Sequence, residues 1–251
     1  MTKNLENRVA IVTGASSGVG RGVAKVLAEH GAKVCVCARR MENLEALTQE
    51  VRAGGGDMFP VACDVTDPAQ IHNVVQQCVE HYGGVDILVN LAQGAMLYRP
   101  LMELDMDYTM LAFKSGALAS LIFMQECFPY LKESGHGRII NTASAAGYDG
   151  AEGFGAYGMA KEAIRAITRT AANEWGQYGI TANVFLPIIA TDTFRETQPA
   201  ALKSLENKTP LHRIGTTEED CAPLIAFLVS DEGRYLTGQS YMVDGGIHKH
   251  T

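Results

Sequence analysis

Short runs of β-branched and apolar residues alternate with longer segments of helical spacing along most of the chain. The runs predict strands at residues 9–13, 34–37, 59–62, 87–90, 139–142 and 182–185. Segments between them, such as 21–30, 42–52 and 69–82, have helical periodicity and end close to glycines. This alternation predicts an α/β fold with a doubly wound parallel sheet, helices on both faces, and a ligand site beyond the carboxyl ends of the strands.

No linker, charge block or internal repeat divides the 251 residues, so we expect a single domain spanning residues 1–251. The net charge of -7 comes without clustered cations, which argues against a nucleic-acid partner. No apolar stretch predicts a membrane span or a signal peptide, and the six cysteines lack metal-ligand spacing. We therefore expect a cytoplasmic protein with reduced thiols, no metal and no membrane partner.

Residues 191–215 have mixed polarity and two prolines, and they follow a predicted strand. Loops at the carboxyl ends of strands commonly carry function, which favours a substrate lid here. The alternative is an ordinary surface connection with a short helix.

A glycine-rich turn follows the first predicted strand and leads into a helix. Its spacing is GxxxGxG, and glycines in this position let a pyrophosphate approach backbone N–H groups at the helix start. The alternative is tight packing of strand against helix. The expected cofactor contacts in the turn are Gly14, Ser16, Ser17, Gly18, Val19 and Gly20.

Together with the glycine-rich turn, Tyr157-Gly158-Met159-Ala160-Lys161 makes the chain resemble the short-chain dehydrogenase/reductase family over nearly its whole length. The resemblance implies a Rossmann-like fold, an oxidoreductase activity and a nicotinamide cofactor. It implies that Ser144, Tyr157 and Lys161 are catalytic. It also implies cofactor contacts from Asp64, Val65, Asn90, Ala92, Tyr157, Lys161 and Thr191.

The second predicted strand is followed by Arg39 and Arg40, where an acidic residue would bind the ribose hydroxyls of NAD. In an arbitrary sequence such a pair is typical of a solvated helix start. After a dinucleotide turn, guanidinium groups favour a 2′-phosphate and hence NADP(H). Arg39 matches the family's phosphate-binding arginine, whereas Arg40 either stacks on adenine or faces solvent.

Tyr157 and Lys161 are four residues apart, so on a helix they share one face. A nearby ammonium is expected to lower the phenol pKa, although simple packing of stem against ring is the common alternative. The resemblance implies that Tyr157 protonates a carbonyl during reduction or deprotonates an alcohol during oxidation. It implies that Lys161 also binds the nicotinamide ribose and that Ser144 binds the substrate oxygen.

The sequence departs from the family on the substrate side. Phe113 stands where the family has an asparagine that holds a water chain to the lysine, and helical direction is expected to point Lys114 and Ser115 elsewhere. Two interpretations follow: an active oxidoreductase with an altered proton relay, which we favour, or a cofactor-binding protein whose catalysis has decayed.

An apolar small molecule, such as a ketone or a hydroxysteroid-like alcohol, is the expected substrate, since no basic patch for a carrier protein is evident. Gln93, Ser144 and Phe154 are the expected substrate contacts. Mixed apolar faces on residues 104–132 and 156–178, together with the resemblance, predict a homotetramer or homodimer. The apolar pocket is expected to include Gln93, Met96, Phe113, Tyr148, Phe154, Leu186 and Phe194.

Overall fold

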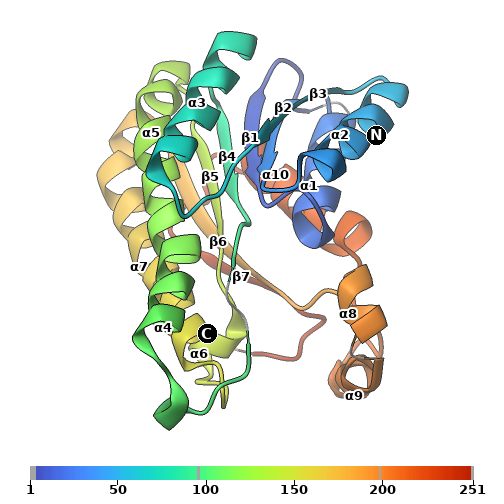
Figure 1. Cartoon of the computed structure of the whole chain (residues 1–251). Helices are drawn as coiled ribbons and strands as arrows, with labels where there is room; N and C mark the ends of the chain where they lie inside the picture. The colour runs from blue at the N-terminus through green and yellow to red at the C-terminus, as the bar shows by residue number, and fades with distance from the viewer. Residues whose placement is uncertain (1–3, 95–96, 198, 250–251) are drawn as a thin grey trace.

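Seven parallel strands form one central sheet in the computed structural model, which describes residues 4–94, 97–197 and 199–249. Their order is β3-β2-β1-β4-β5-β6-β7, so the chain winds outward in both directions from β1 and β4. The prediction of a single-domain, doubly wound, Rossmann-like α/β fold is confirmed (Figure 1). The strands are β1 (Val9–Thr13), β2 (Lys33–Ala38), β3 (Asp57–Ala62), β4 (Ile87–Asn90), β5 (Arg138–Thr142), β6 (Thr181–Pro187) and β7 (Ser240–Val243).

Strand β7 was not among the predicted strands. It is four residues long, has a single β-branched residue and is only half-buried at the edge of the sheet, so its local pattern is weak. Strand β7 is held by hydrogen bonds to β6, which pair Val184 with Ser240 through to Pro187 with Val243. The local sequence pattern does not contain this pairing.

Helices cover both faces of the sheet (Figure 1). Alternate side chains of β1 divide between two cores, Ala10 and Val12 in one and Val9 and Ile11 in the other. The first core lies under α1 (Gly18–Glu29), α2 (Met41–Ala53) and α10 (Ala222–Val229). The second lies under α3 (Pro68–Tyr82), α5 (Ala119–Ser134) and α7 (Gly155–Trp175).

Helix α3 illustrates how local sequence sets the bounds of a crossover helix. The Asp67 side chain accepts a hydrogen bond of 2.9 Å from the N–H of Ala69, and Pro68 occupies the first helical position. Gly83 ends the helix with φ of 91°, a left-handed conformation that glycine adopts without strain.

The predicted helical segment 104–132 is one continuous but irregular helix. After η1 (Leu101–Glu103), α4 (Met106–Phe113) leads into a π-helical turn, η2 (Lys114–Leu118), and then into α5. Helix α7 ends in a short 3-10 turn, η3 (Gly176–Tyr178). None of the helices in the described ranges combines the length and apolar character that crossing a bilayer requires.

The segment 191–215 forms two helices, α8 (Asp192–Thr197) and α9 (Pro199–Lys208). Leu202 of α9 packs with Ala190 and Ile214 in a small separate core. Figure 1 shows both helices projecting below α1 and away from the sheet. The movement of this segment as a substrate lid stays a prediction. The remaining short elements are α6 (Ala145–Tyr148) and a π-helical turn, η4 (Thr217–Cys221), before α10.

All six cysteines are free and buried. Cys35 is hydrogen-bonded to Cys78 and Cys37 to Cys63, and these contacts together with burial raise the pKa of Cys35 and Cys37 well above the ordinary thiol value. The thiols are therefore packed as small apolar side chains.

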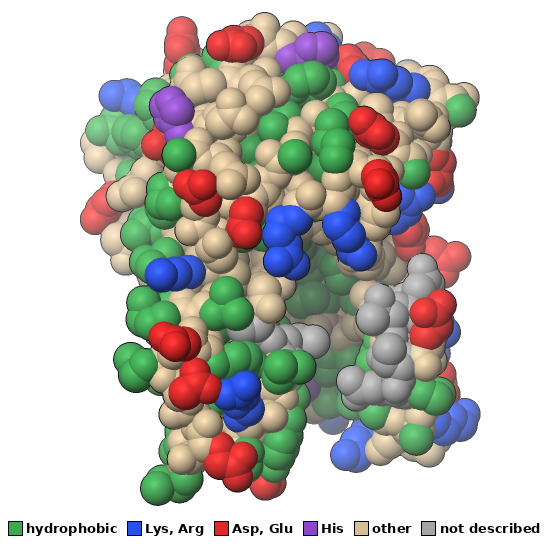
Figure 2. Space-filling model, in the orientation of Figure 1, with side chains coloured by type: hydrophobic (Ala, Val, Ile, Leu, Met, Phe, Trp, Pro, Cys, Tyr) green, Lys and Arg blue, Asp and Glu red, His purple; other side chains and the backbone are tan. Residues whose placement is uncertain are grey.

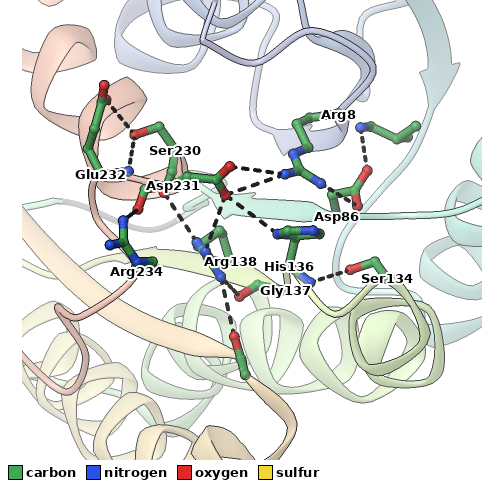
Figure 3. A network of polar contacts seen from close by, with 12 residues as sticks. Arg8, Asp86, Ser134, His136, Gly137, Arg138, Ser230, Asp231, Glu232 and Arg234 are labelled. Atoms are coloured by element: carbon green, nitrogen blue, oxygen red, sulfur yellow. Dashed lines mark hydrogen bonds and ion pairs between the residues drawn. The ribbon is translucent and has the colours of Figure 1, made fainter.

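A polar network joins the amino ends of the strands to the segment after α10 (Figure 3). Buried Arg138 donates to the carbonyl oxygens of Gly137 at 3.0 Å and Gly179 at 3.3 Å. Asp231 accepts from Arg8 at 3.4 Å and forms ion pairs with His136 and Arg138 at 3.5 and 3.9 Å. This network lies at the edge of the sheet opposite the predicted ligand site.

Candidate active site

The carboxyl ends of the parallel strands bring most of the predicted site residues to one edge of the sheet. The glycine-rich turn follows β1, Arg39 follows β2 and Asp64 lies just after β3. Asn90 ends β4, and Ser144 lies just after β5. Residues from five separate parts of the sequence therefore share the edge at which such folds bind ligands.

The glycine-rich turn leaves room and donors for a phosphate group. Gly14 and Gly18 have φ of 71° and 55°. A Cβ atom on Gly14 would lie 3.0 Å from the backbone of Ala92, and one on Gly18 would lie 3.3 Å from the Thr191 methyl group. Ser17 begins α1 without a side-chain capping bond, so N–H groups at the helix start are available to an anion. The turn fits the pyrophosphate of a dinucleotide.

The two arginines after β2 differ in their contacts. Arg40, predicted to stack on adenine or face solvent, is exposed and donates to the Ser16 and Ser17 hydroxyl oxygens at 3.3 Å each. Hydrogen bonds from Thr66 lower the pKa of Asp64, and the positive charge of Arg39 adds to that effect. Both exposed guanidinium groups thus flank the rim of the predicted adenosine site.

Ser144, Tyr157 and Lys161 converge beyond the end of β5. The Ser144 oxygen caps α6 by accepting from the N–H of Ala146 at 3.2 Å, and the hydroxyl is hydrogen-bonded to the Tyr157 phenol. Lys161, 2% exposed, donates to the carbonyl oxygen of Thr142 at 2.9 Å. Its Nζ atom lies 5.4 Å from the centre of the Tyr157 ring. The expected grouping of the three side chains is therefore present.

The electrostatic balance of this group differs from the sequence-based expectation. Burial raises the pKa of Tyr157 above the ordinary phenol value, and the hydrogen bond with Ser144 offsets only part of the rise. Burial also lowers the pKa of Lys161 to about 7. The expected lowering of the phenol pKa was wrong, because burial of the Tyr157 phenol outweighs the lowering influence on it.

The prediction that Ser115 points away from the site was also wrong. The π-helical turn η2 rotates the helix surface, and the buried Ser115 oxygen accepts a hydrogen bond of 3.0 Å from the N–H of Gly94. Gln93 donates from Nε2 to the carbonyl oxygen of Ala112 at 3.3 Å, so its amide lies against the helix. Phe113 packs beside Ala156 and Ala160 between α4 and α7. The sequence signal for Ser115 was a lone hydroxyl among apolar residues.

Other predicted site residues have internal partners. Asn90 donates to Asn141 at 2.9 Å, and Asn141 donates to Thr168 at 2.8 Å in a buried chain that the sequence did not reveal. The Thr13 hydroxyl, also missed, accepts from the N–H groups of Leu91 and Ala92.

The predicted apolar pocket is only partly gathered at this edge. The Phe154 ring lies 6.4 Å from the Tyr157 ring, edge to face, whereas Leu186 is buried in a sheet core with Ala143 and Val184. Phe194 packs against the small core at α9, and Met96 lies outside the described residues.

A deep hollow opens between the part of the molecule that carries α4 and the part formed by α8 and α9 (Figure 2). Hydrophobic side chains cover much of its wall, and Lys or Arg side chains stand at its upper rim. The hollow lies below the carboxyl edge of the sheet, where a ligand would meet both apolar and cationic surface.

Sequence comparison agrees with this geometry. A family profile described as enoyl-(acyl carrier protein) reductase matches residues 14–248. The chain belongs to the short-chain dehydrogenase/reductase family. Similar members of the family include a 12alpha-hydroxysteroid dehydrogenase of Clostridium, 33% identical over 96% of this chain and 97% of the relative. The chain is also 34% identical to a 3-oxoacyl-(acyl-carrier-protein) reductase of Thermotoga maritima, over 97% and 98%.

The 2,5-dichloro-2,5-cyclohexadiene-1,4-diol dehydrogenase of Sphingobium indicum is 32% identical over 98% of each chain. All three relatives are named as dehydrogenases or reductases, so this member of the short-chain dehydrogenase/reductase family is an oxidoreductase by family.

Proposed function

We propose that the protein is an NADP(H)-dependent oxidoreductase that interconverts a carbonyl and a secondary alcohol on a predominantly apolar small molecule, either a ketone or a hydroxysteroid-like compound. The observation that carries the proposal is the grouping of Ser144, Tyr157 and Lys161 next to a dinucleotide-type glycine turn. Hydroxyl donors placed at one point stabilise the negative charge that develops on a substrate oxygen.

In this proposal Ser144 and Tyr157 hold the substrate oxygen and Tyr157 transfers the proton. The raised pKa of Tyr157 keeps its phenol protonated, which suits a proton donor in carbonyl reduction. A bound nicotinamide supplies or accepts the hydride. Lys161 holds the nicotinamide ribose, and its bond to Thr142 fixes the direction of its side chain.

The preference for NADP(H) rests on Arg39 and Arg40, since no carboxylate occupies the end of β2. A 2′-phosphate beside two guanidinium groups gains charge-assisted hydrogen bonds, whereas a ribose hydroxyl lacks that charge. Arg40 already lies over Ser16 and Ser17 of the glycine turn, within reach of the same ligand.

The preference for an apolar substrate is supported by the hydrophobic wall of the hollow and by the half-buried ring of Phe154 near Tyr157. The similarity to a 12alpha-hydroxysteroid dehydrogenase supports a hydroxysteroid-like compound, and the equal similarity to a 3-oxoacyl-(acyl-carrier-protein) reductase makes the thioester the competing substrate that the experiment must test. Gln93 stays a predicted substrate contact: its Nε2 group donates to the helix, whereas its buried Oε1 atom has no hydrogen-bond partner within the described residues.

We also propose a homotetramer or homodimer. Met106 and Met110 of α4, Leu118 of η2 and Met159 of α7 have exposed fractions between 39% and 70%. Burial of such side chains against a second copy removes apolar surface from water. Light scattering at micromolar concentration tests this, and a monomer there contradicts it.

The deciding experiment measures NADPH and NADH oxidation with ketones, aldehydes, oxosteroids and 3-oxoacyl thioesters, and the reverse reaction with alcohols. Tyr157→Phe is expected to reduce turnover by roughly 10²- to 10⁴-fold with cofactor binding retained. Tyr241→Phe is the matched control, because it removes a buried hydroxyl on β7 that has no hydrogen-bond partner within the described structure. Tight NADPH binding without turnover in either direction would favour the cofactor-binding alternative.

A further inference from the structure

His248, close to the carboxyl end of the chain, lies between two carboxylates from different elements. Its Nδ1 atom is 2.7 Å from Oδ2 of Asp244, just after β7, and its Nε2 atom is 2.9 Å from Oδ2 of Asp149, just after α6. The backbone N–H groups of Gly246 and His248 also donate to Asp244, at 2.9 Å each. Figure 1 shows the carboxyl end of the chain beside α6.

The contact with Asp149 reaches the segment that joins two residues of the candidate active site. Ser144 caps the start of α6, Asp149 ends it, and the chain then runs through Phe154 into α7, which carries Tyr157. The N–H of Asp149 donates to the carbonyl oxygen of Ala145 at 2.8 Å. Any restraint on Asp149 therefore restrains the spacing between Ser144 and the α7 residues.

Charged and aromatic groups from several elements surround His248. The carboxylates of Asp149 and Asp244 face its two ring nitrogens. Tyr148, the residue before Asp149, carries the Arg165 guanidinium 4.6 Å from its ring centre, and Arg165 is itself paired with Glu162 at 2.8 Å. Burial by itself would raise the pKa of Asp244, but hydrogen bonds from His248 and Gly246 outweigh it and hold the pKa below its ordinary value.

We propose that His248 is a positioning residue, whose imidazole ring ties the segment after β7 to Asp149 and so fixes the Ser144–Phe154 wall of the substrate site. Its effect on substrate binding rests on the proposed function, whereas the tie itself does not. An imidazolium has two N–H donors and a neutral imidazole has one, so only the protonated ring donates to both carboxylates.

The two carboxylates that contact His248 differ in exposure. The Asp244 side chain is 3% exposed and the shorter contact is to this group, so it would lose most by losing a donor. The Asp149 side chain is 36% exposed and water can replace the imidazole there. The contact with Asp149 is therefore the one through which a change at position 248 reaches the Ser144–Phe154 wall.

Amide hydrogen exchange tests the tie without any turnover. The N–H groups of Asp149 and Ala151 donate to Ala145 and Ala146 and report on this wall. At pH 6 they are expected to exchange about two- to fivefold faster in His248→Ala than in the unaltered protein. Asp149→Asn should resemble His248→Ala at Ala151. Equal exchange in all three proteins at pH 6 would overturn the proposal.

Kinetics then test the effect on substrate. For a ketone found by the substrate panel, His248→Ala is expected to raise KM about two- to fivefold at pH 6 and leave kcat unchanged. His136→Ala is the matched control, because His136 also pairs with a carboxylate, at 3.5 Å, but at the opposite edge of the sheet (Figure 3). A KM that is the same in His248→Ala as in the unaltered protein would overturn the positioning role. If no ketone is turned over, the proposed function fails, and the exchange result still decides whether His248 holds the wall.

Discussion

The Lys161 ammonium points at the Thr142 carbonyl oxygen, 2.9 Å away, and lies 5.4 Å from the centre of the Tyr157 ring. The lysine is therefore held by the strand that ends just before Ser144, close to the Tyr157 ring. Because burial lowers the pKa of Lys161 to about 7, its positive charge is partial at neutral pH in the chain without ligand.

The two directions of the reaction should differ in pH dependence. Reduction needs protonated Tyr157, and its raised pKa keeps the phenol protonated through the neutral range. Oxidation needs Tyr157 to accept a proton, so kcat/KM for the alcohol should rise between pH 7 and 10 by up to about tenfold per pH unit, while that for the ketone does not rise. Initial rates in both directions across a buffer series measure this. An alcohol profile that falls with pH would contradict the assignment.

Arg39→Ala and Arg40→Ala should each weaken NADPH binding more than NADH binding. Loss of a charge-assisted hydrogen bond to a phosphate costs about 1.5–3 kcal/mol, or roughly 10- to 100-fold in Kd. Fluorescence titration with both cofactors measures the ratio. Arg21→Ala is the matched control, since Arg21 lies on α1 and pairs with Glu50. Equal losses for NADPH and NADH would remove the phosphate assignment.

Ser115→Ala should destabilise the fold, because it leaves the Gly94 N–H without its acceptor. We expect the free energy of unfolding to fall by about 1–3 kcal/mol in urea titration. Thr109→Ala on α4 is the control, with an expected change within about 0.5 kcal/mol.

Phe113→Asn should lower stability and not increase kcat, because it places an amide among Ala156 and Ala160. A higher kcat in Phe113→Asn would show that the family asparagine can act here.

Arg138→Met should lower the free energy of unfolding by about 1–3 kcal/mol, since it removes a donor from the Gly179 carbonyl oxygen and leaves the Gly137 carbonyl oxygen with the N–H of Thr181 alone. Asp231→Asn should cost less than about 1 kcal/mol, because the Asp231 side chain is 64% exposed. Figure 3 shows both residues in one network, so urea titration of the two variants separates the buried from the exposed part. Equal losses would contradict this division.

Sequence alone was enough for strands β1 to β6, the glycine-rich turn and the Ser144, Tyr157 and Lys161 group, because each has a local pattern or a fixed spacing. The π-helical turn at Lys114–Leu118 has no such pattern. Its geometry depends on a hydrogen bond between Ser115 and a loop about 20 residues earlier, which periodicity does not encode. The sequence therefore did not predict the direction of the Ser115 side chain.

The arginine pair shows the same limit at a finer scale. The sequence shows two arginines after β2. It does not show that Arg40, at the start of α2, donates hydrogen bonds to Ser16 and Ser17. Likewise, the burial that lowers the pKa of Lys161 comes from tertiary packing, which the four-residue spacing from Tyr157 does not contain.

The buried cysteines allow unfolding of the protein to be measured by chemical labelling of its thiols. Burial and the charge of Asp220 raise the pKa of Cys221 to about 12, and all six sulfur atoms are enclosed, so alkylating reagents should label the chain only through molecules that open transiently. Brief exposure to such a reagent followed by mass spectrometry would count opened molecules without any added dye. Each variant described above could be ranked for stability in this way from a few micrograms of material, before its substrate is known.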